Sequence, residues 1–315
     1  MKKKFILNKE LKIFEKQFIF FLKSKILFLN KIKNYFFLKK GKYVRPLLIF
    51  LITKMLGTIS KKTYKLASII ELIHTASIIH DDVIDNSSFR RGFLTINSLW
   101  NNKIAVIFGD YIFSKSLNLA LNQNYNHLFS NLILKMSEGE LYQIDFIKNN
   151  KFSEKNYYKI IFNKTAFLIS TCCEQSGKLL KKKHTLFFLK KIGILIGFSF
   201  QIKDDLLDYN HFNTKNFFFK LNETKITLPF IYSLNKASFK EKKLIFNLSK
   251  KNFLFCYKQY KQLINFIFFL GGIEFSIYKM KLFTNKALIQ LNNFPNNSAN
   301  KSLKTLIFFF INRNF

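Results

Sequence analysis

Apolar residues recur with helical spacing along most of this chain of 315 residues. Between residues 72 and 84, for example, they follow the spacing that buries one side of a helix. Three prolines and ten glycines are few for this length, which favours long helices over strands and tight turns. The pattern therefore predicts an all-α protein.

Helices are expected along the whole chain, and no linker rich in Gly, Ser or Pro separates them. Residues 1–38 are expected to form one or two amphipathic helices, and residues 231–313 three or four further ones. The helices expected between these two segments cover residues 47–56, 62–86, 104–122, 128–147, 154–177 and 186–210. We therefore predict a single helical domain over residues 1–315.

The aspartates of the chain are gathered in two copies of one pattern. The chain has 18 acidic residues, eight of them aspartates, and six of these eight lie in DDVID (81–85) and DDLLD (204–208). In each copy the first and last aspartates are four positions apart and share a helix face. Such a regular placement in a basic chain indicates a function for both copies.

Basic side chains accompany the first aspartate pattern. His74 lies about two turns before Asp81 on the same expected helix, and Arg90 and Arg91 follow soon after that helix ends. Guanidinium groups match phosphate oxygens, and carboxylate oxygens are ligands that Mg²⁺ accepts. This set predicts Mg²⁺ bridging the protein and a polyphosphate substrate.

The net charge of +34 raises the question of a nucleic-acid partner. Lys, Asn, Ile and Phe are abundant together and all have AT-rich codons, so the charge reflects composition throughout the chain rather than a patch. No zinc-finger, RNA-recognition or helix-turn-helix pattern accompanies it, and we predict no nucleic-acid partner. The charge still favours the approach of anionic substrates and peripheral contact with anionic membranes.

The cysteines and the apolar runs bear on the location of the protein. Cys172, Cys173 and Cys256 lack the spacing of metal ligands, so we expect reduced core thiols in a cytoplasmic protein. The apolar run after the basic start is too short for a signal peptide. The uncharged run 263–273 has the length of a buried helix, and we predict no transmembrane span.

Some polar residues in the middle of the chain are interpreted as structural. Asp110 is expected to cap a helix or pair locally, and Glu138, Glu140 and Gln143 to form a polar seam between helices. Lys164, which apolar residues surround, would ordinarily extend its ammonium group to solvent.

Six motifs, in their order and spacing, make the chain resemble the trans-isoprenyl diphosphate synthases, most closely the bacterial all-trans polyprenyl synthases of octaprenyl type. The motifs are GKxxRP (41–46), HDDVID…RRG (80–92), GDxxF (109–113), KTA (164–166), FQIKDDLLD (200–208) and KxTLP (225–229). The resemblance covers nearly the whole chain. It implies an all-α bundle around a central cavity, usually a homodimer.

The resemblance also implies a reaction, the Mg²⁺-dependent head-to-tail condensation of isopentenyl diphosphate onto an allylic diphosphate. Four aspartates would then be the metal ligands: Asp81, Asp85, Asp204 and Asp208. Four polar residues would contact the allylic diphosphate: Arg90, Lys164, Gln201 and Lys225. Four others would hold isopentenyl diphosphate: Lys42, Arg45, His74 and Arg91. The Thr165 hydroxyl would stabilise the carbocation by its dipole.

Some positions depart from the pattern of that family. Tyr43 stands where another Arg is common, and Lys40 where a second Gly is common. In the loop 210–224, an aromatic stretch at 217–220 replaces a more polar one and Thr224 replaces a Gly, which affects loop closure and the role of Lys215.

Small side chains before the first aspartate motif indicate a long product. Ala76 and Ser77 lie about one turn before Asp81, where short-chain members often carry bulky aromatic residues. We therefore expect a product longer than farnesyl diphosphate, about C40, which would serve as a quinone side chain. A floor set deeper in the cavity by one of the phenylalanines is the alternative.

Other functions are also considered beside the long-chain synthase. The second hypothesis is a synthase of a shorter product, farnesyl or geranylgeranyl diphosphate. The third is a non-catalytic subunit of a heteromeric synthase, although such subunits typically lose aspartates from one motif and both motifs are complete here. A class I terpene cyclase is disfavoured because it has no second diphosphate to hold with Lys42, Arg45 and Arg91.

Overall fold

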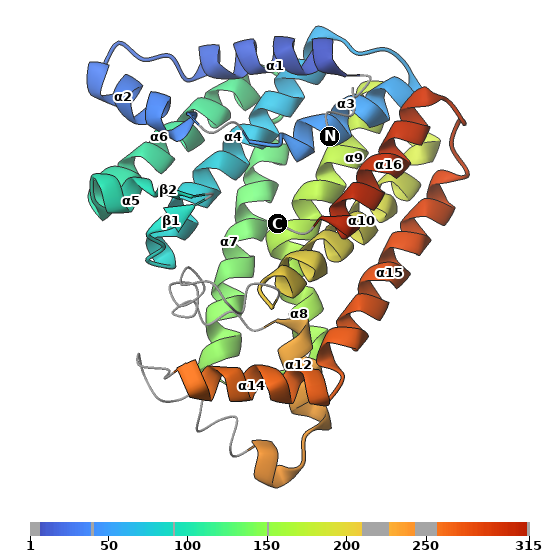
Figure 1. Ribbon diagram of the computed structural model, residues 1–315. Coiled ribbons are helices and arrows are strands. Elements are labelled where there is room, and N and C mark those ends of the chain that lie inside the picture. Colours follow the sequence, from blue (N-terminus) through green and yellow to red (C-terminus); the bar gives the residue numbers. More distant parts are fainter. Residues whose placement is uncertain are drawn as a thin grey trace. The chain divides into compact units, whose positions relative to one another are not determined.

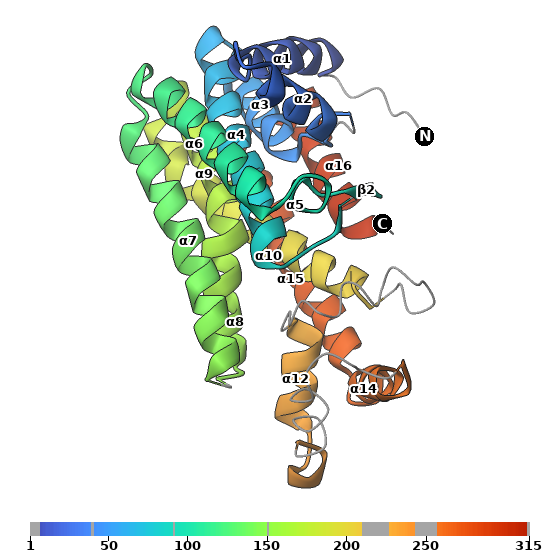
Figure 2. The same ribbon diagram turned by 90° about the vertical axis from the view of Figure 1, so that its left-hand side faces the viewer.

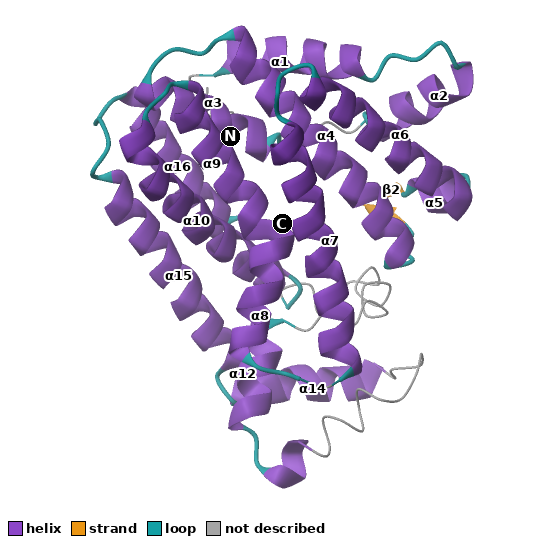
Figure 3. Cartoon of the chain, turned by 180° about the vertical axis from the view of Figure 1, so that it is seen from behind, coloured by secondary structure: helices purple, strands orange, loops and turns teal. Residues whose placement is uncertain are grey.

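The structure is a computed structural model that describes residues 7–38, 41–90, 92–149, 151–209, 227–242 and 257–313. Within these ranges the regular elements are helices, apart from one short hairpin (Figure 3). This confirms the predicted all-α class. The described chain divides into two compact units, and each is treated by itself. The prediction of a single domain over residues 1–315 therefore stays a prediction.

Unit 1 consists of Met1–Lys135, Leu168–Gly193 and Gln290–Thr305. Helix α4 (Lys61–Ile84) lies along α6 (Asn102–Leu121), and α1 (Asn8–Phe21) crosses α3 (Val44–Leu56) and α4 (Figures 1 and 2). The other complete elements of unit 1 are α2 (Leu27–Phe36), β1 (Phe89–Arg90), β2 (Phe93–Leu94), α5 (Ile96–Leu99) and a 3₁₀ turn (Lys183–Thr185).

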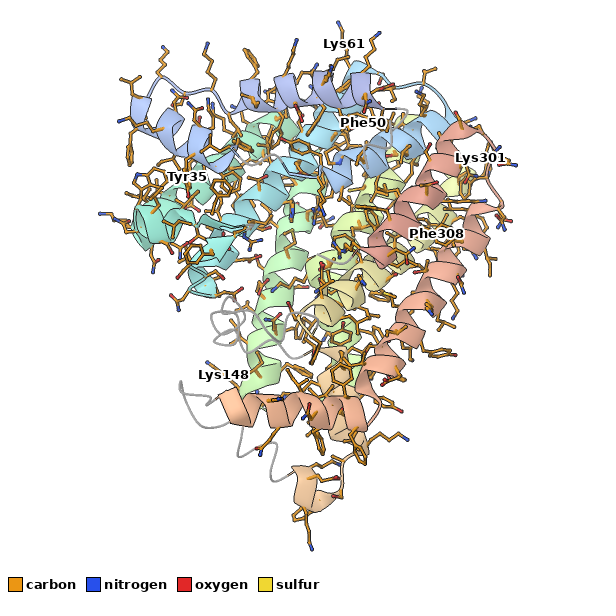
Figure 4. The ribbon with its side chains drawn as sticks, in the orientation of Figure 1. Tyr35, Phe50, Lys61, Lys148, Lys301 and Phe308 are labelled. Atoms are coloured by element: carbon orange, nitrogen blue, oxygen red, sulfur yellow. The ribbon has the colours of Figure 1, made fainter. Side chains whose placement is uncertain are left out.

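The core of unit 1 explains why α4 is long. A capping box formed by Ser60 and Thr63 starts the helix, and apolar side chains then line its buried face. An aromatic group packs nearby, in which Phe14 stacks on Phe18 and meets Phe50 edge-on. Phe50 lies among the helices, whereas Lys61 stands on the outer surface (Figure 4).

Unit 2 consists of Met136–Phe167, Ile194–Ile289 and Leu306–Phe315. Its core joins apolar residues of several helices that are far apart in sequence, among them Ile202, Leu206 and Ile231. Its complete elements are α8 (Glu154–Ile161), a π-helical turn (Phe162–Ala166), α12 (Leu228–Lys236) and α14 (Tyr257–Phe269). Four helices contribute to both units: α7 (Asn126–Lys148), α9 (Phe167–Leu179), α10 (Leu186–Leu207) and α16 (Ser298–Asn312); α15 (Gly272–Leu291) lies almost wholly in unit 2.

Two local features differ from the sequence-based expectation. The helix expected over 154–177 is interrupted by the π-helical turn Phe162–Ala166, which separates α8 from α9. The chain after the first aspartate motif forms the β1–β2 hairpin, a feature that the sequence analysis did not predict. Hydrophobic periodicity reports neither feature, because the π turn lies within a helix that continues on both sides and each strand has only two residues.

Some described helices are long and apolar. By length and composition alone, α6 and the segment Lys183–Leu207 could cross a membrane, and the bent pair Lys261–Phe269 and Gly272–Leu291 would add a third candidate. Part of this apolar character has another cause, because Ile202 and Leu206 of α10 lie in the core of unit 2. The prediction of no transmembrane span remains a prediction.

Candidate active site

The first aspartate motif closes α4 in unit 1. Asp81 and Asp85 are half-buried, whereas Asp82 between them is buried. The helix ends here because Asn86 adopts a left-handed conformation with φ of 50°, a common way to stop a helix. The two outer carboxylates thus keep contact with solvent, and the middle one faces the protein.

Asp82 binds Arg90. The Arg90 guanidinium donates from Nε to both carboxylate oxygens at 2.8 and 3.0 Å, and its Nη2 lies 2.7 Å from Oδ1. Asn97 of α5 donates to the backbone carbonyls of Asp82 and Ser87, which fixes the chain after the motif. Arg90, predicted to contact a diphosphate, is therefore held in place by Asp82 and has a side chain 39% exposed. Arg91 lies outside the described residues.

The GDxxF motif on α6 surrounds His80, which directly precedes the first aspartate motif. His80 Nε2 lies 3.2 Å from the Val106 carbonyl oxygen and 3.4 Å from Asp110 Oδ1. A Cβ at Gly109 would come within 2.2 Å of the same nitrogen, so a larger residue there would displace the His80 ring from this position. Asp110, expected to cap a helix or pair locally, instead approaches His80 of the neighbouring helix α4.

The other predicted cations of unit 1 lie on α4 and at the start of α3. Lys42 is exposed, and Arg45 and His74 are half-buried. Tyr43, the departure noted in the sequence, is buried and packs edge-on against Phe14. Its role is therefore in the aromatic core and not in binding an anion.

The second aspartate motif closes α10 in unit 2 and repeats the arrangement of the first. Asp204 and Asp208 are half-buried, and Asp205 between them is buried. Asp205 accepts hydrogen bonds from the Tyr157 hydroxyl at 2.6 Å and from Gln201 Nε2 at 3.1 Å. In both motifs, then, the middle carboxylate is buried while the outer two are half-buried and keep contact with solvent.

The KTA motif forms the π-helical turn, a conformation often found at functional sites. Glycines allow two helices to approach this turn closely. A Cβ at Gly139 of α7 would lie 3.0 Å from the Lys164 backbone nitrogen, and one at Gly197 of α10 would lie 2.4 Å from Ala166 Cα. The backbone of the turn is thus clamped between α7 and α10.

The side chains of this turn are bound by neighbours in unit 2. Lys164 Nζ lies 2.5 Å from Glu140 Oε1 and donates to Gln143 Oε1 at 3.3 Å. The Thr165 hydroxyl donates to Gln201 Oε1 at 2.6 Å. Since Gln201 also donates to Asp205, a continuous hydrogen-bonded chain links Thr165 to the second aspartate motif. Of the polar residues expected to form a seam on α7, Glu140 and Gln143 bind Lys164.

Burial raises the pKa of Asp205 to about 7, with Asp208 and Asp204 adding to the shift and the hydrogen bonds from Tyr157 and Gln201 opposing it. A carboxyl group with a raised pKa binds its proton more tightly in the folded than in the unfolded chain. Its contribution to stability is therefore complete below about pH 4, its unfolded pKa, and is lost as the pH rises towards 7.

We expect Asp205→Asn to remove this pH dependence. Between pH 5 and pH 8, the free energy of unfolding of the wild type should fall relative to that of Asp205→Asn by about 2–3 kcal/mol. Urea titrations in the presence of EDTA at both pH values measure the difference. Parallel pH profiles for the two proteins would contradict the assignment.

Further polar contacts lie around the end of α10 in unit 2. The hydroxyls of Tyr209 and Thr227 hydrogen-bond to each other, which ties the KxTLP motif to the end of α10. Lys225, the predicted cation of that motif, lies outside the described residues. Arg313, which the sequence analysis did not single out, forms an ion pair with Asp204.

The outer aspartates suit a divalent cation that is shared with a substrate. Among the described residues, no three His, Cys, Asp or Glu side chains are gathered closely enough to hold a metal by themselves. Mg²⁺ typically binds through one or two carboxylates and completes its shell with water and substrate phosphates. The solvent-accessible pair Asp81 and Asp85, and likewise Asp204 and Asp208, fit this donor set.

The chain is similar to curated prenyl diphosphate synthases. It is 37% identical over 186 residues to decaprenyl-diphosphate synthase of Dictyostelium discoideum, a match covering 58% of this chain and 40% of that protein. It is 31% identical over 235 residues to octaprenyl diphosphate synthase of Escherichia coli, covering 71% and 72% of the two chains. It is 29% identical to geranylgeranyl diphosphate synthase of Saccharolobus solfataricus, over 93% of this chain and 92% of that one.

Solved structures share the fold. Heptaprenyl diphosphate synthase from Staphylococcus aureus superposes with a TM-score of 0.85 at 29% identity, covering 99% of this chain and 100% of that chain. Polyprenyl synthase from Caulobacter crescentus, solved with calcium and isoprenyl diphosphate, gives a TM-score of 0.89 at 24% identity, covering 98% and 96%.

The polyprenyl synthetase family model matches residues 27–267, most of the chain. The chain therefore belongs to the polyprenyl synthetase family, and the predicted all-α isoprenoid synthase fold is confirmed. Its curated relatives are polyprenyl diphosphate synthases, which are prenyltransferases, and both long-chain and short-chain enzymes occur among them. The family uses a divalent metal.

Proposed function

We propose that this protein elongates an allylic diphosphate with isopentenyl diphosphate, in a Mg²⁺-dependent, head-to-tail, all-trans reaction. The observation that carries the proposal is the repeated arrangement of the two aspartate motifs. Each one binds its middle carboxylate to the protein and leaves the outer two half-buried and in reach of solvent. If the two motifs were only solvated helix ends, there would be no reason for both to have one buried aspartate between two half-buried ones.

The described residues provide the polar chemistry that this reaction requires. Mg²⁺ bound by the outer aspartates would neutralise diphosphate oxygens and so favour departure of the leaving group. Lys164 and Arg90 are cations whose positions are set by Glu140 and Asp82, so they are oriented before substrate binds. Lys42, Arg45 and His74 would bind isopentenyl diphosphate without metal, which leaves its C–O bond intact.

Further details of the function rest on the same proposal. We place Arg91 with the cations that hold isopentenyl diphosphate and Lys225 with those that contact the allylic diphosphate. We also infer a cytoplasmic location, supported by the buried free thiols Cys172 and Cys173. Burial raises the pKa of Cys172 to about 12, which keeps this thiol protonated and unreactive.

We propose a long-chain product of about C40, the octaprenyl length, for use as a quinone side chain. On α4, Ala76 is buried and Ser77 is half-buried, with its hydroxyl hydrogen-bonded to the His74 carbonyl oxygen. Neither residue is large enough to stop a growing prenyl chain one turn before Asp81. A synthase of a shorter product remains the alternative, since a geranylgeranyl diphosphate synthase is among the relatives.

The chain length can be measured directly. With farnesyl diphosphate and labelled isopentenyl diphosphate, the wild type should release products well beyond geranylgeranyl diphosphate, and Ser77→Phe should shift them to shorter lengths because the ring blocks the path along α4. Lys62→Phe, at the exposed start of the same helix, is the control and should leave the distribution unchanged. Wild-type products that end at farnesyl or geranylgeranyl diphosphate would refute the long-chain assignment.

We propose that the protein is a homodimer that pairs through α6. This helix exposes Val106, Ile107, Leu117 and Leu121, of which Ile107 and Leu121 are 53% and 54% exposed. A row of apolar side chains on one helix of a monomer marks an association surface. Sedimentation equilibrium of the full chain should give twice the monomer mass, and a monomer at micromolar concentration would contradict the pairing.

We also propose peripheral contact between the α1–α2 region and an anionic membrane. Phe20 and Leu27 are 69% and 82% exposed, and Phe20 lines an open hollow of about 450 Å³ together with Lys16, Lys23 and Lys33. Exposed apolar side chains ringed by lysines suit an anionic lipid surface. The protein should float with phosphatidylglycerol vesicles and not with phosphatidylcholine vesicles. Flotation with neither kind of vesicle would contradict the contact.

A further inference from the structure

The end of the C-terminal helix reaches the second aspartate motif. Arg313 directly follows α16, and its Nη2 forms an ion pair with Asp204 Oδ1. The same nitrogen donates to the Phe200 backbone carbonyl at 3.3 Å, and the guanidinium carbon lies 4.1 Å from the centre of the Phe200 ring. One arginine thus contacts two residues of α10 that are four positions apart and share a helix face.

Packing holds Arg313 in this position. Phe310, one turn earlier on α16, is buried and meets the Phe200 ring edge-on with 5.3 Å between the ring centres. The Phe200 ring therefore contacts an aromatic edge and a guanidinium, and the Arg313 side chain is only 11% exposed. A cation desolvated to this degree is stabilised by a nearby carboxylate, here that of Asp204.

The ion pair matters because Asp204 is one of the outer aspartates assigned to the divalent cation. A divalent cation and a guanidinium repel each other, and both would be held by the one Asp204 carboxylate. Lys203, next in sequence to Asp204, adds further positive charge in this region. Repulsion between the two cations would therefore favour displacement of the Arg313 side chain when a metal ion binds at Asp204.

We propose that Arg313 is a positioning residue that holds the Asp204 carboxylate and competes with the divalent cation for it. Metal binding at the second motif then releases the end of α16, and Arg313 sets the metal concentration at which this happens. The inference rests on the proposed metal-binding role of Asp204. It predicts that removing Arg313 makes metal binding tighter, whereas loss of a purely structural contact would make it weaker or leave it unchanged.

The test measures metal binding without turnover. Binding of Mn²⁺ alone to the full chain is followed by the electron paramagnetic resonance signal of the free ion, for the wild type, Arg313→Gln and Arg313→Lys. Lys304→Gln is the matched control, because it removes another cation of α16, one that donates to Asn292. Arg313→Gln should lower the Kd for Mn²⁺ about three- to tenfold, because the competitor no longer occupies part of the Asp204 population. Arg313→Lys should bind with intermediate affinity, and Lys304→Gln as the wild type does.

A second measurement reports the release itself. Hydrogen exchange of the last turn of α16 should become faster when Mn²⁺ is added to the wild type, and should be equally fast with and without Mn²⁺ in Arg313→Gln. An unchanged or higher Kd in Arg313→Gln, or exchange that does not respond to Mn²⁺ in the wild type, would overturn the competition. Asp204→Asn distinguishes the metal-binding role of Asp204 from the competition by Arg313. If this variant binds as much Mn²⁺ as the wild type, the metal role of Asp204 fails; if it loses Mn²⁺ while Arg313→Gln does not gain affinity, only the competition fails.

Discussion

Replacing Asp81 with alanine is expected to lower kcat by about a thousandfold or more, equivalent to about 4 kcal/mol of transition-state stabilisation. Asp204→Ala should have an effect of the same size. Both residues are half-buried outer aspartates in contact with solvent, and the proposed metal ion would take the place of partners such as Arg313 at Asp204. Incorporation of labelled isopentenyl diphosphate under saturating substrate and Mg²⁺ measures kcat.

The same variants should remain folded, and this separates a chemical role from a structural one. Circular dichroism and thermal unfolding of Asp81→Ala should resemble those of the wild type, because the buried carboxylate of the first motif is that of Asp82. Asp204→Ala should keep the helical content of the wild type but unfold at a lower temperature, because it also removes the carboxylate that pairs with Arg313. Asp145→Ala, which removes an exposed aspartate of α7, is the control and should retain full activity. Substantial activity in Asp81→Ala would remove this residue from the metal site.

The sequence was sufficient to predict the helices and the chemistry that it states directly. Helical spacing of apolar residues locates α4, α6 and α7 to within a few residues, since burial of one face is what produces that spacing. The aspartate motifs could be found because acidic residues are rare in this chain, so six aspartates in two copies of one pattern stand out. Family membership followed from the order of the motifs and is confirmed by the family model.

The partners of the site residues could not be predicted, because each pairing joins positions far apart in the sequence. Nothing in the local pattern around Tyr157 or Arg313 indicates that they bind Asp205 and Asp204, which only the packing of α8 and α16 against α10 brings about. The different roles of the three aspartates in each motif were hidden for the same reason. Identical side chains one position apart differ in burial, and burial depends on the helices that pack around them.

Lys164→Ala is expected to lower kcat by about a hundredfold, because removing a preorganised donor at a developing negative charge typically has an effect of this size. Lys164 is suited to that role: its ammonium group is held 2.5 Å from Glu140 Oε1, and its side chain is 25% exposed and so within reach of a substrate. Lys155→Ala, at the exposed start of α8, is the control and should retain wild-type kcat. Unchanged turnover in Lys164→Ala would exclude the lysine from the reaction.

The Lys164–Glu140 pair adds a complication that a second variant resolves. Removing Lys164 also leaves the Glu140 carboxylate without its ammonium partner, and this negative charge would repel an incoming diphosphate. If repulsion causes the loss, the double variant Lys164→Ala/Glu140→Ala should recover most of the activity, and the recovery should appear mainly as a lower KM for the allylic diphosphate. If the missing cation causes it, kcat should stay about a hundredfold below that of the wild type in the double variant, because neutralising Glu140 cannot replace a donor to the leaving group.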